Sequence, residues 1–215
     1  MALNVLVTTA TGKVGRATIA ALGDRNARVA AYVRDPDRAR TGADHLAVEE
    51  ALRASWVAEV VAVRPNVFMQ NFLDQAVAIG HGALPGPTGD PRVSFVDADD
   101  VGRVAAAALT APSVPDGVLE VTGPEALSWF DVAAHMTEVL GRPITHYPAA
   151  PDVIREGLRA IGREEWQIEH AVELSALFGD PRAAVVTDTV AQLTGARPAG
   201  VTDFLRRHAA ELPAA

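Results

Sequence analysis

The first part of the chain alternates between short apolar runs and longer stretches whose apolar positions follow a helical period. Residues 4–9, "NVLVTT", form a continuous run of apolar and β-branched side chains, which is typical of a strand buried in a parallel sheet. Apolar residues then recur at helical spacing over residues 14–22, and a second apolar run over residues 27–34 ends shortly before Pro36. The pattern predicts a β-strand, an α-helix and a second β-strand.

The same alternation continues as far as residue 123. The pattern predicts helices over residues 43–55, 67–80 and 101–110, and strands over residues 57–66, 93–96 and 117–123. Residues 81–92 are rich in glycine and proline and are predicted to form a loop. Asp99 or Asp100 is the expected N-cap of the helix that follows. Strands separated by helices favour a parallel sheet and therefore the α/β class.

Helical patterns dominate after residue 125. Ser128, followed three residues later by Asp131, predicts a capped helix start. Further helices are predicted over residues 150–162, 164–179 and 187–195. We therefore predict a parallel-sheet core over residues 1–125 and a mainly helical lobe over residues 126–215, joined in one compact unit.

Composition narrows the chemistry that this fold can carry. The chain contains no cysteine, which excludes disulfides, thiolate catalysis and cysteine-ligated zinc, and its histidine and aspartate spacing predicts no metal site. The net charge of −8 argues against a nucleic-acid partner, and the basic segment "FLRRHAA" is interpreted as a solvated helix end. Because neither a leader-like segment nor a membrane-length apolar run occurs, we expect a cytoplasmic protein without a membrane partner.

Several longer motifs occur along the chain in a recognisable order. They are the opening strand, turn and helix, then "VRDPDRA", "RPNVFMQNF", "FVDADDVGRVAAAALT" and "LEVTGPEALSWFDVAAHMTEVLGRPI". Together they resemble the NmrA-like atypical short-chain dehydrogenases/reductases over most of the chain. The resemblance implies an NADP(H)-binding Rossmann core, a cleft between this core and a C-terminal substrate lobe, and a role as a reductase of quinones and related small molecules or as a cofactor-sensing regulator.

The nucleotide turn departs from the pattern of that family. The family pattern Thr-Gly-Ala-Thr-Gly-x-x-Gly corresponds here to "TTATGKVG", so that Thr9 replaces the first glycine. A β-branched threonine is poorly suited to a positive φ, and its side chain projects toward the expected position of a nucleotide. Gly12 and Gly15 are retained, and these glycines allow the pyrophosphate to approach and the helix to pack.

A second departure shortens the sheet. Only "DRARTGADHLAVEEALRAS" stands where the family has a longer stretch with further strands, so we expect a truncated Rossmann-like sheet that lacks about three central strands. The shortened sheet closes either on itself, with the strand over residues 57–66 beside the first strand, or through a homodimer.

Both departures affect the cofactor, and we therefore expect no cofactor, with NADP(H) as the alternative. If a nucleotide binds, the resemblance implies contacts in the turn and at the position where the family uses an arginine for the 2′-phosphate. These residues are Thr9, Thr11, Gly12, Lys13, Val14, Gly15 and Arg34.

Two pairs of residues are candidates for catalysis. His45 matches a histidine that begins the corresponding helix in many relatives, and Glu49 lies one turn later, where it can orient the imidazole as a general acid or base. The alternative is an ordinary exposed helical pair. Asn66 and Gln70 follow the predicted carboxyl end of a strand, where open α/β sheets bind ligands, and their amides either position a substrate oxygen or serve packing.

A further set of side chains is expected to line the substrate site. It comprises Phe68, Met69, Asn71, His81, Tyr147 and Trp166. His146, Trp129 and Phe130 are additional candidates, although aromatic residues on helices more often belong to the core.

Three functions remain open. The preferred hypothesis is an enzyme of specialised metabolism that has lost nicotinamide use and catalyses non-redox proton transfer, such as cyclisation, isomerisation, elimination or hydrolysis, on an apolar carbonyl or phenolic metabolite. The alternatives are an NADPH-dependent reductase of a quinone or related carbonyl and a non-catalytic ligand-sensing or regulatory protein. The Tyr-x-x-x-Lys pair of ordinary short-chain dehydrogenases does not occur in the sequence.

Overall fold

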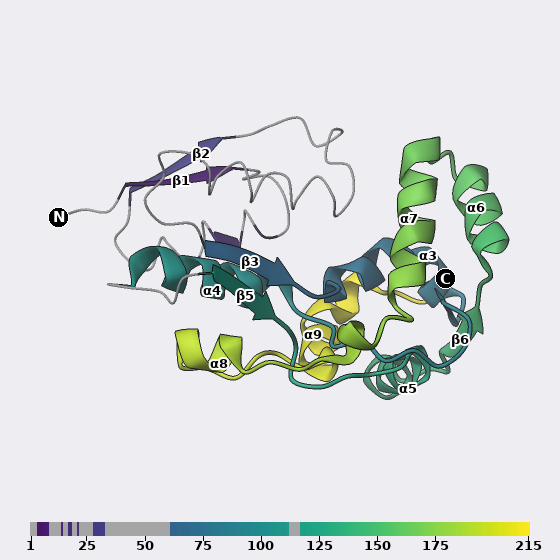
Figure 1. Cartoon of the computed structure of the whole chain (residues 1–215). Helices are drawn as coiled ribbons and strands as arrows, with labels where there is room; N and C mark the ends of the chain where they lie inside the picture. Colours follow the sequence, from purple (N-terminus) through teal and green to yellow (C-terminus); the bar gives the residue numbers. More distant parts are fainter. Residues whose placement is uncertain are drawn as a thin grey trace. The chain divides into compact units, whose positions relative to one another are not determined.

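The structure of the chain is a computed structural model. It describes residues 4–8, 28–32, 61–111 and 117–215, together with the helical positions Val14, Ala17, Thr18 and Ala21 (Figure 1). Over these residues the fold is α/β, with short parallel strand pairs and helices between them, as the hydrophobic pattern predicts.

Two parallel strand pairs belong to the first compact unit. Strand β1 (Asn4–Thr8) pairs with β2 (Arg28–Tyr32), and β3 (Val61–Pro65) pairs with β5 (Gly117–Val121). All four strands fall inside predicted ones. The predicted place of the third strand beside the first stays a prediction, since the described ladder joins β3 to β5.

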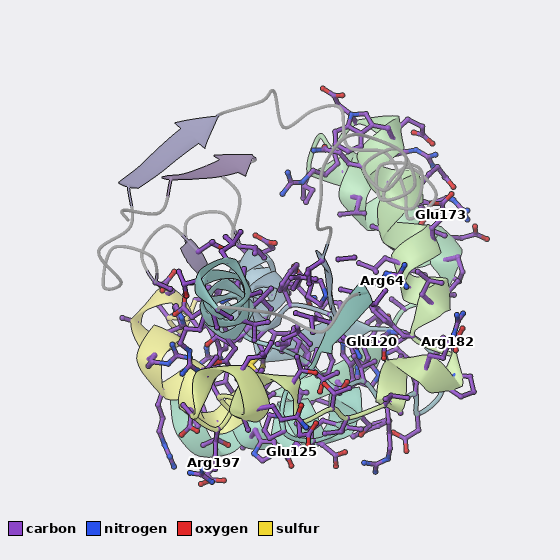
Figure 2. The ribbon with its side chains drawn as sticks, turned by 60° about the vertical axis from the view of Figure 1, so that its left-hand side comes forward. Arg64, Glu120, Glu125, Glu173, Arg182 and Arg197 are labelled. Atoms are coloured by element: carbon purple, nitrogen blue, oxygen red, sulfur yellow. The ribbon has the colours of Figure 1, made fainter. Side chains whose placement is uncertain are left out.

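Helices cover the pair formed by β3 and β5. Helix α4 (Ala98–Thr110) packs against β3, and α8 (Thr189–Thr194) packs against both α4 and β5. The hydroxyl of Thr187 donates to the Glu120 carbonyl at 2.9 Å, which ties the segment before α8 to β5. Arg64 and Glu120 lie opposite each other in the register of these strands (Figure 2).

The second unit contains strands that the sequence analysis missed. Strand β4 (Ala83–Gly86) pairs in parallel with β6 (Thr145–Pro148), and α5 (Trp129–Leu140) packs against both. The prediction of a loop over residues 81–92 is therefore wrong for β4. Pro85 and Gly86 are residues that weaken a strand pattern, but β4 is short and receives its hydrogen bonds from a distant segment.

Two other elements also differ from the predicted ones. The predicted helix over residues 67–80 consists of a 3₁₀ helix, η2 (Met69–Gln75), and the short helix α3 (Ala76–Gly80). The predicted strand over residues 93–96 forms only isolated bridges, from Val93 to Leu127 and from Phe68 to Val96.

Among the remaining helices, α6 (Pro151–Ala160) and α7 (Glu165–Leu177) agree with predicted ones, and α9 (Val201–His208) contains most of the basic segment that was interpreted as a helix end. The 3₁₀ helices η3 (Pro181–Ala184) and η4 (Ala209–Glu211) are not among the predicted elements. Figure 1 shows α6 and α7 side by side, and the Arg155 guanidinium joins them by donating to both carboxylate oxygens of Glu169, at 2.8 and 3.2 Å.

A row of aromatic rings forms the centre of the second unit. The Phe95 ring lies 5.1 Å from both Phe72 and Trp129, and Trp129 lies 4.7 Å from Phe178. Gly86 lies directly against the indole, since a Cβ there would meet the Trp129 Cδ1 atom at 2.2 Å. Close contact between β4 and α5 therefore depends on the absence of a side chain at this position.

The two compact units are each assembled from separate stretches of chain. The first comprises residues 1–65, 98–122 and 187–198, and the second comprises residues 66–97, 123–186 and 199–215. The boundary predicted between residues 125 and 126 follows chain order instead, and it stays a prediction.

Candidate functional site

The nucleotide turn is expected at the edge of the pair formed by β1 and β2. Because these strands are parallel and pair Thr8 with Tyr32, their carboxyl ends lie at the same edge. The turn follows Thr8 directly in the sequence, and Arg34 follows Tyr32 by two positions. Val14 is helical and half-buried. The other predicted nucleotide contacts, Thr9, Thr11, Gly12, Lys13, Gly15 and Arg34, lie outside the described residues, as do His45 and Glu49.

Helix α4 supports the helix that follows this turn. A Cβ at Gly102 would lie 2.5 Å from the Cβ of Ala17 and 2.7 Å from the backbone nitrogen of Thr18, so only glycine allows the two helices to approach this closely. Thr18 is buried, and its hydroxyl donates to the Val14 carbonyl at 2.9 Å. The helix after the turn is therefore held by direct backbone contact with α4.

Asn66 connects three segments of the second unit. Its Nδ2 atom donates to the Ser94 hydroxyl at 2.7 Å and to the Ala183 carbonyl at 2.9 Å, while its Oδ1 atom accepts from the Val67 backbone N–H at 2.8 Å. Ser94 also donates to the Val185 carbonyl at 2.6 Å. Through these hydrogen bonds Asn66 stabilises the fold of the second unit. Whether Asn66 also contacts a ligand stays a prediction.

Gln70 lies beside the ion pair of Asp97 and Arg207, in which the carboxylate is buried. Its Nε2 atom donates to the Asp97 carboxylate at 2.7 Å, and the guanidinium of Arg207 from α9 binds the other oxygen of that carboxylate. The sequence analysis missed Asp97 and Arg207, because it interpreted "DADD" as a helix cap and "FLRRHAA" as a solvated helix end. Since the two residues are 110 positions apart, no local pattern reveals that they pair.

The other acidic residues of "DADD" belong to α4 itself. The helix begins at Ala98, so Asp99 and Asp100 lie in its first turn, and the prediction that either is the N-cap is wrong. Asp100 is buried and pairs with Arg103 one turn later.

The predicted substrate-lining residues are distributed over several elements of the second unit. Met69 is completely buried in the core, whereas Phe68 and Asn71 are half-buried at η2. His81 is exposed after α3, and Tyr147 on β6 is 59% exposed. Trp166 on α7 donates its indole N–H to Glu164 at 2.6 Å. The proposal that they line one site stays a prediction.

His146 is a buried residue with an incompletely satisfied side chain. Its Nδ1 atom lies 3.1 Å from the Leu84 carbonyl, Phe130 meets the ring edge-on at 4.8 Å, and its Nε2 atom has no hydrogen-bond partner. Trp129 is buried in the aromatic row and its Nε1 atom likewise lacks a partner. Both side chains therefore belong to the packing between α5 and β4.

The start of α5 carries the capping box that the sequence predicts. The Ser128 backbone N–H donates to the Asp131 carboxylate at 3.0 Å, and the Asp131 backbone N–H donates to the Ser128 hydroxyl at 3.2 Å. Chiefly because of that backbone bond from Ser128, the pKa of Asp131 lies below its usual value, and the Ser128 hydroxyl and Arg92 lower the pKa further.

Two other kinds of feature are absent from the described residues. No group of three or more histidine, aspartate or glutamate side chains there could hold a metal ion. None of the helices in that part of the chain is both long and apolar enough to cross a membrane.

Comparison with known proteins finds dehydrogenases and reductases. No protein-family model matches the sequence. The chain is 36% identical over 154 residues to the NAD(P)H azoreductase of Xenophilus azovorans, which covers 71% of this chain and 54% of that protein. It is 33% identical over 148 residues to the agroclavine dehydrogenase of Claviceps purpurea, covering 66% of this chain and 51% of that one.

Solved structures share the fold. The NADPH-dependent quinone oxidoreductase of Escherichia coli superimposes with a TM-score of 0.76 at 16% identity, over 94% of this chain and 98% of that one. The Citrobacter triphenylmethane reductase, solved with NADP(H), superimposes with a TM-score of 0.72 at 14% identity, over 94% and 99%. The chain resembles the NmrA-like atypical short-chain dehydrogenases/reductases in its motifs, and it shares the fold of these NAD(P)-binding reductases. This NmrA-like chain has the truncated Rossmann-like fold that its sequence predicts.

These findings correct the expectation about the cofactor. The expectation that this NmrA-like protein uses none is wrong, because the azoreductase relative is named for NAD(P)H and the quinone oxidoreductase fold has also been solved with NADPH. The relatives named above are dehydrogenases and reductases, and none of them supports non-redox chemistry. The chain spans about half the length of the curated relatives that it matches.

Proposed function

We propose that this protein is an NAD(P)H-dependent reductase that transfers a hydride to a small organic acceptor, such as a quinone or a related carbonyl compound. The observation that carries the proposal is the 36% identity to an NAD(P)H azoreductase over 154 residues. Over a match of that length, such identity supports a related activity, and the shared fold of NADPH-dependent reductases agrees with it.

The described strands fit a nicotinamide dinucleotide. A Rossmann half-site needs two parallel strands joined by a helix, with the pyrophosphate at the helix N-terminus, and the chain has this order in β1, the helical positions Val14, Ala17, Thr18 and Ala21, and β2. Gly12 would let the pyrophosphate approach the backbone, Gly15 would let the helix pack closely, and Arg34 would pair with the 2′-phosphate. The bound cofactor supplies the hydride, and the protein binds and orients both reactants.

The acceptor is assigned to the residues that follow β3. Gln70 would donate an amide N–H to an oxygen of the acceptor, and the half-buried Phe68 would contact its apolar part. His45, oriented by Glu49, is the proposed source of the proton that balances hydride transfer to a carbonyl.

Nucleotide binding and turnover test the proposal directly. NADPH and NADH are titrated by fluorescence and calorimetry, and the oxidation of each is followed at 340 nm with 1,4-naphthoquinone and an azo dye as acceptors. We expect saturable NADPH binding with a dissociation constant between about 1 μM and 1 mM, and acceptor-dependent oxidation. Absence of binding by either nucleotide at millimolar concentration would contradict the proposal.

Two variants identify the nucleotide contacts. Arg34→Ala should weaken NADPH binding while leaving NADH binding nearly unchanged, since only NADPH carries the 2′-phosphate. Thr9→Gly restores the family glycine and should tighten both nucleotides, because strain in such a turn costs about 1–3 kcal/mol. Equal losses for NADPH and NADH in Arg34→Ala would remove this residue from the 2′-phosphate site.

A further inference from the structure

The Gln70 side chain, which we assign to the acceptor site, is hydrogen-bonded to the buried carboxylate of Asp97. Asp97 is 1% exposed, and its two oxygens bind different partners, namely the Nε2 atom of Gln70 at 2.7 Å and the guanidinium of Arg207. Arg207 is 45% exposed, so it connects the buried carboxylate to the surface of α9. The three side chains form a continuous polar chain, which we call the Gln70–Asp97–Arg207 relay.

Backbone bonds bring the relay together. The Met69 N–H donates to the Val96 carbonyl, and the Val96 N–H donates to the Val67 carbonyl, both at 2.9 Å. These bonds hold the start of η2 alongside the segment that ends at Asp97. Gln70 and Asp97 therefore meet because both follow the same bridge, from Phe68 to Val96.

The chemistry of the pair determines which way the amide points. An ionised carboxylate only accepts hydrogen bonds, so the nitrogen of the Gln70 amide must face Asp97, and the opposite rotamer would set oxygen against oxygen. A buried carboxylate is costly without a cation, and Arg207 supplies a positive charge beside it. The ion pair therefore fixes the orientation of the amide.

We propose that Asp97 is a positioning residue that holds the Gln70 carboxamide in one orientation in the acceptor site, with Arg207 as its charge partner. The proposal rests on the proposed function, in which Gln70 contacts the acceptor. Asp97 touches neither reactant, and its effect on turnover passes through Gln70. An amide held in one orientation favours one pattern of donors and acceptors on the ligand, so the relay also contributes to the choice of acceptor.

Because Asp97 directly precedes α4, its replacement can also affect the structure, and a matched control is needed to separate that effect from the positioning role. The chain offers one in Asp100, which is also 1% exposed and also pairs with a partly exposed arginine, Arg103. Asp97→Asn and Asp100→Asn each remove the charge from a buried carboxylate that is paired with an arginine. Both variants should lower stability, but only the first alters the environment of Gln70.

The first measurement needs no catalysis. In ¹⁵N-labelled protein, the side-chain amide signals of Gln70, assigned by their loss in Gln70→Ala, are compared between variants. We expect the two proton signals to shift and to exchange faster with water in Asp97→Asn, and to remain unchanged in Asp100→Asn. Unchanged Gln70 signals in Asp97→Asn would overturn the proposal, whatever the activity of the protein.

The second measurement uses steady-state kinetics with 1,4-naphthoquinone at saturating NADPH. Asp97→Asn should raise KM for the quinone on the order of tenfold, as expected for loss of a charge-assisted hydrogen bond, and should leave the dissociation constant of NADPH unchanged. Combining it with Gln70→Ala should add no further increase, because both changes act on one contact. Arg207→Lys, which keeps the charge, should recover most of the activity that Arg207→Ala loses.

Two results separate the two proposals. If the wild-type protein neither binds NADPH nor oxidises it, the proposed function fails, while the Gln70 amide signals still decide whether Asp97 orients this side chain. If the wild-type protein is active, the proposed function stands, and either of two results overturns the positioning role of Asp97. One is an equal increase of KM in Asp97→Asn and Asp100→Asn. The other is a KM in the double variant that equals the product of the separate effects of Asp97→Asn and Gln70→Ala.

Discussion

Single residues at close contacts set the geometry of both units. Gly86 and Gly102 lie where a side chain would overlap a neighbour, and neither is needed for a left-handed backbone. Sequence reasoning treats such glycines as loop or helix-weakening residues. The structure shows instead that each allows a backbone to approach a particular side chain or helix.

Gly86→Ala should destabilise the second unit. The added Cβ would lie 2.2 Å from Trp129, whose ring is held between Phe95 and Phe178 and cannot turn aside easily. Overpacking of this kind costs about 1–3 kcal/mol, which chemical denaturation with intrinsic tryptophan fluorescence can measure. In the control Gly157→Ala the new Cβ meets nothing within 4 Å, so helix propensity should stabilise α6 by up to about 1 kcal/mol. A neutral Gly86→Ala variant would contradict the tight contact.

Asp131 makes the free energy of unfolding depend on pH in the acidic range. Its pKa is lowered in the folded state, so the ionised carboxylate stabilises the fold above the unfolded value near 3.9, and this contribution disappears as pH falls through the lower folded pKa. The difference in unfolding free energy between wild type and Asp131→Asn should therefore be constant at neutral pH and shrink below about pH 4. Chemical denaturation from pH 7 to pH 2.5 tests this, and a difference that grows on acidification would contradict it.

At the scale of elements, helix contacts join the helix of the proposed nucleotide site to the rest of the first unit. The helix that follows the nucleotide turn lies against α4 at Ala17 and Thr18, and α4 in turn packs against β3. The sequence predicts both helices from their periodicity. It does not predict their contact, because the small residue that permits it looks like an ordinary interruption of the α4 pattern.

Gly102→Ala should displace the first helix and weaken nucleotide binding. Alanine is normally favoured over glycine in a helix by up to about 1 kcal/mol, so a fall in melting temperature isolates the clash with Ala17. We expect such a fall together with a several-fold weaker NADPH affinity, measured by thermal unfolding and fluorescence titration. A rise in melting temperature, as expected for Gly157→Ala, would show that the two helices are not in close contact.

At the scale of the molecule, local patterns predict the elements better than their partners. β1, β2 and α5 agree with the hydrophobic period and the capping box, which depend on neighbouring residues. β4 was missed because its hydrogen bonds come from β6, and the pair formed by Asp97 and Arg207 was missed because its members are distant in sequence. The sequence predicts Gln70 as a candidate site residue but not its partners Asp97 and Arg207. The contacts among these three residues depend on long-range packing, which leaves no local signal in the sequence.

The predicted boundary between residues 125 and 126 can be tested with a fragment. Phe72 and Phe95 belong to the same core cluster as Trp129 and Phe204, so residues 126–215 alone lack part of their own core. We expect this fragment to show helical circular dichroism without a cooperative thermal transition. A sharp transition with a full heat-capacity change would show that the C-terminal lobe folds by itself.

The interleaving of the two units has a consequence for how such a protein can evolve. Residues 66–97 lie between two stretches of the first unit, and residues 187–198 lie between two stretches of the second. No single crossover between genes can therefore exchange one unit while leaving the other whole. Exchange of one whole unit between relatives needs several crossovers, so we expect new acceptor preferences to arise more readily from substitutions, insertions and deletions within a unit.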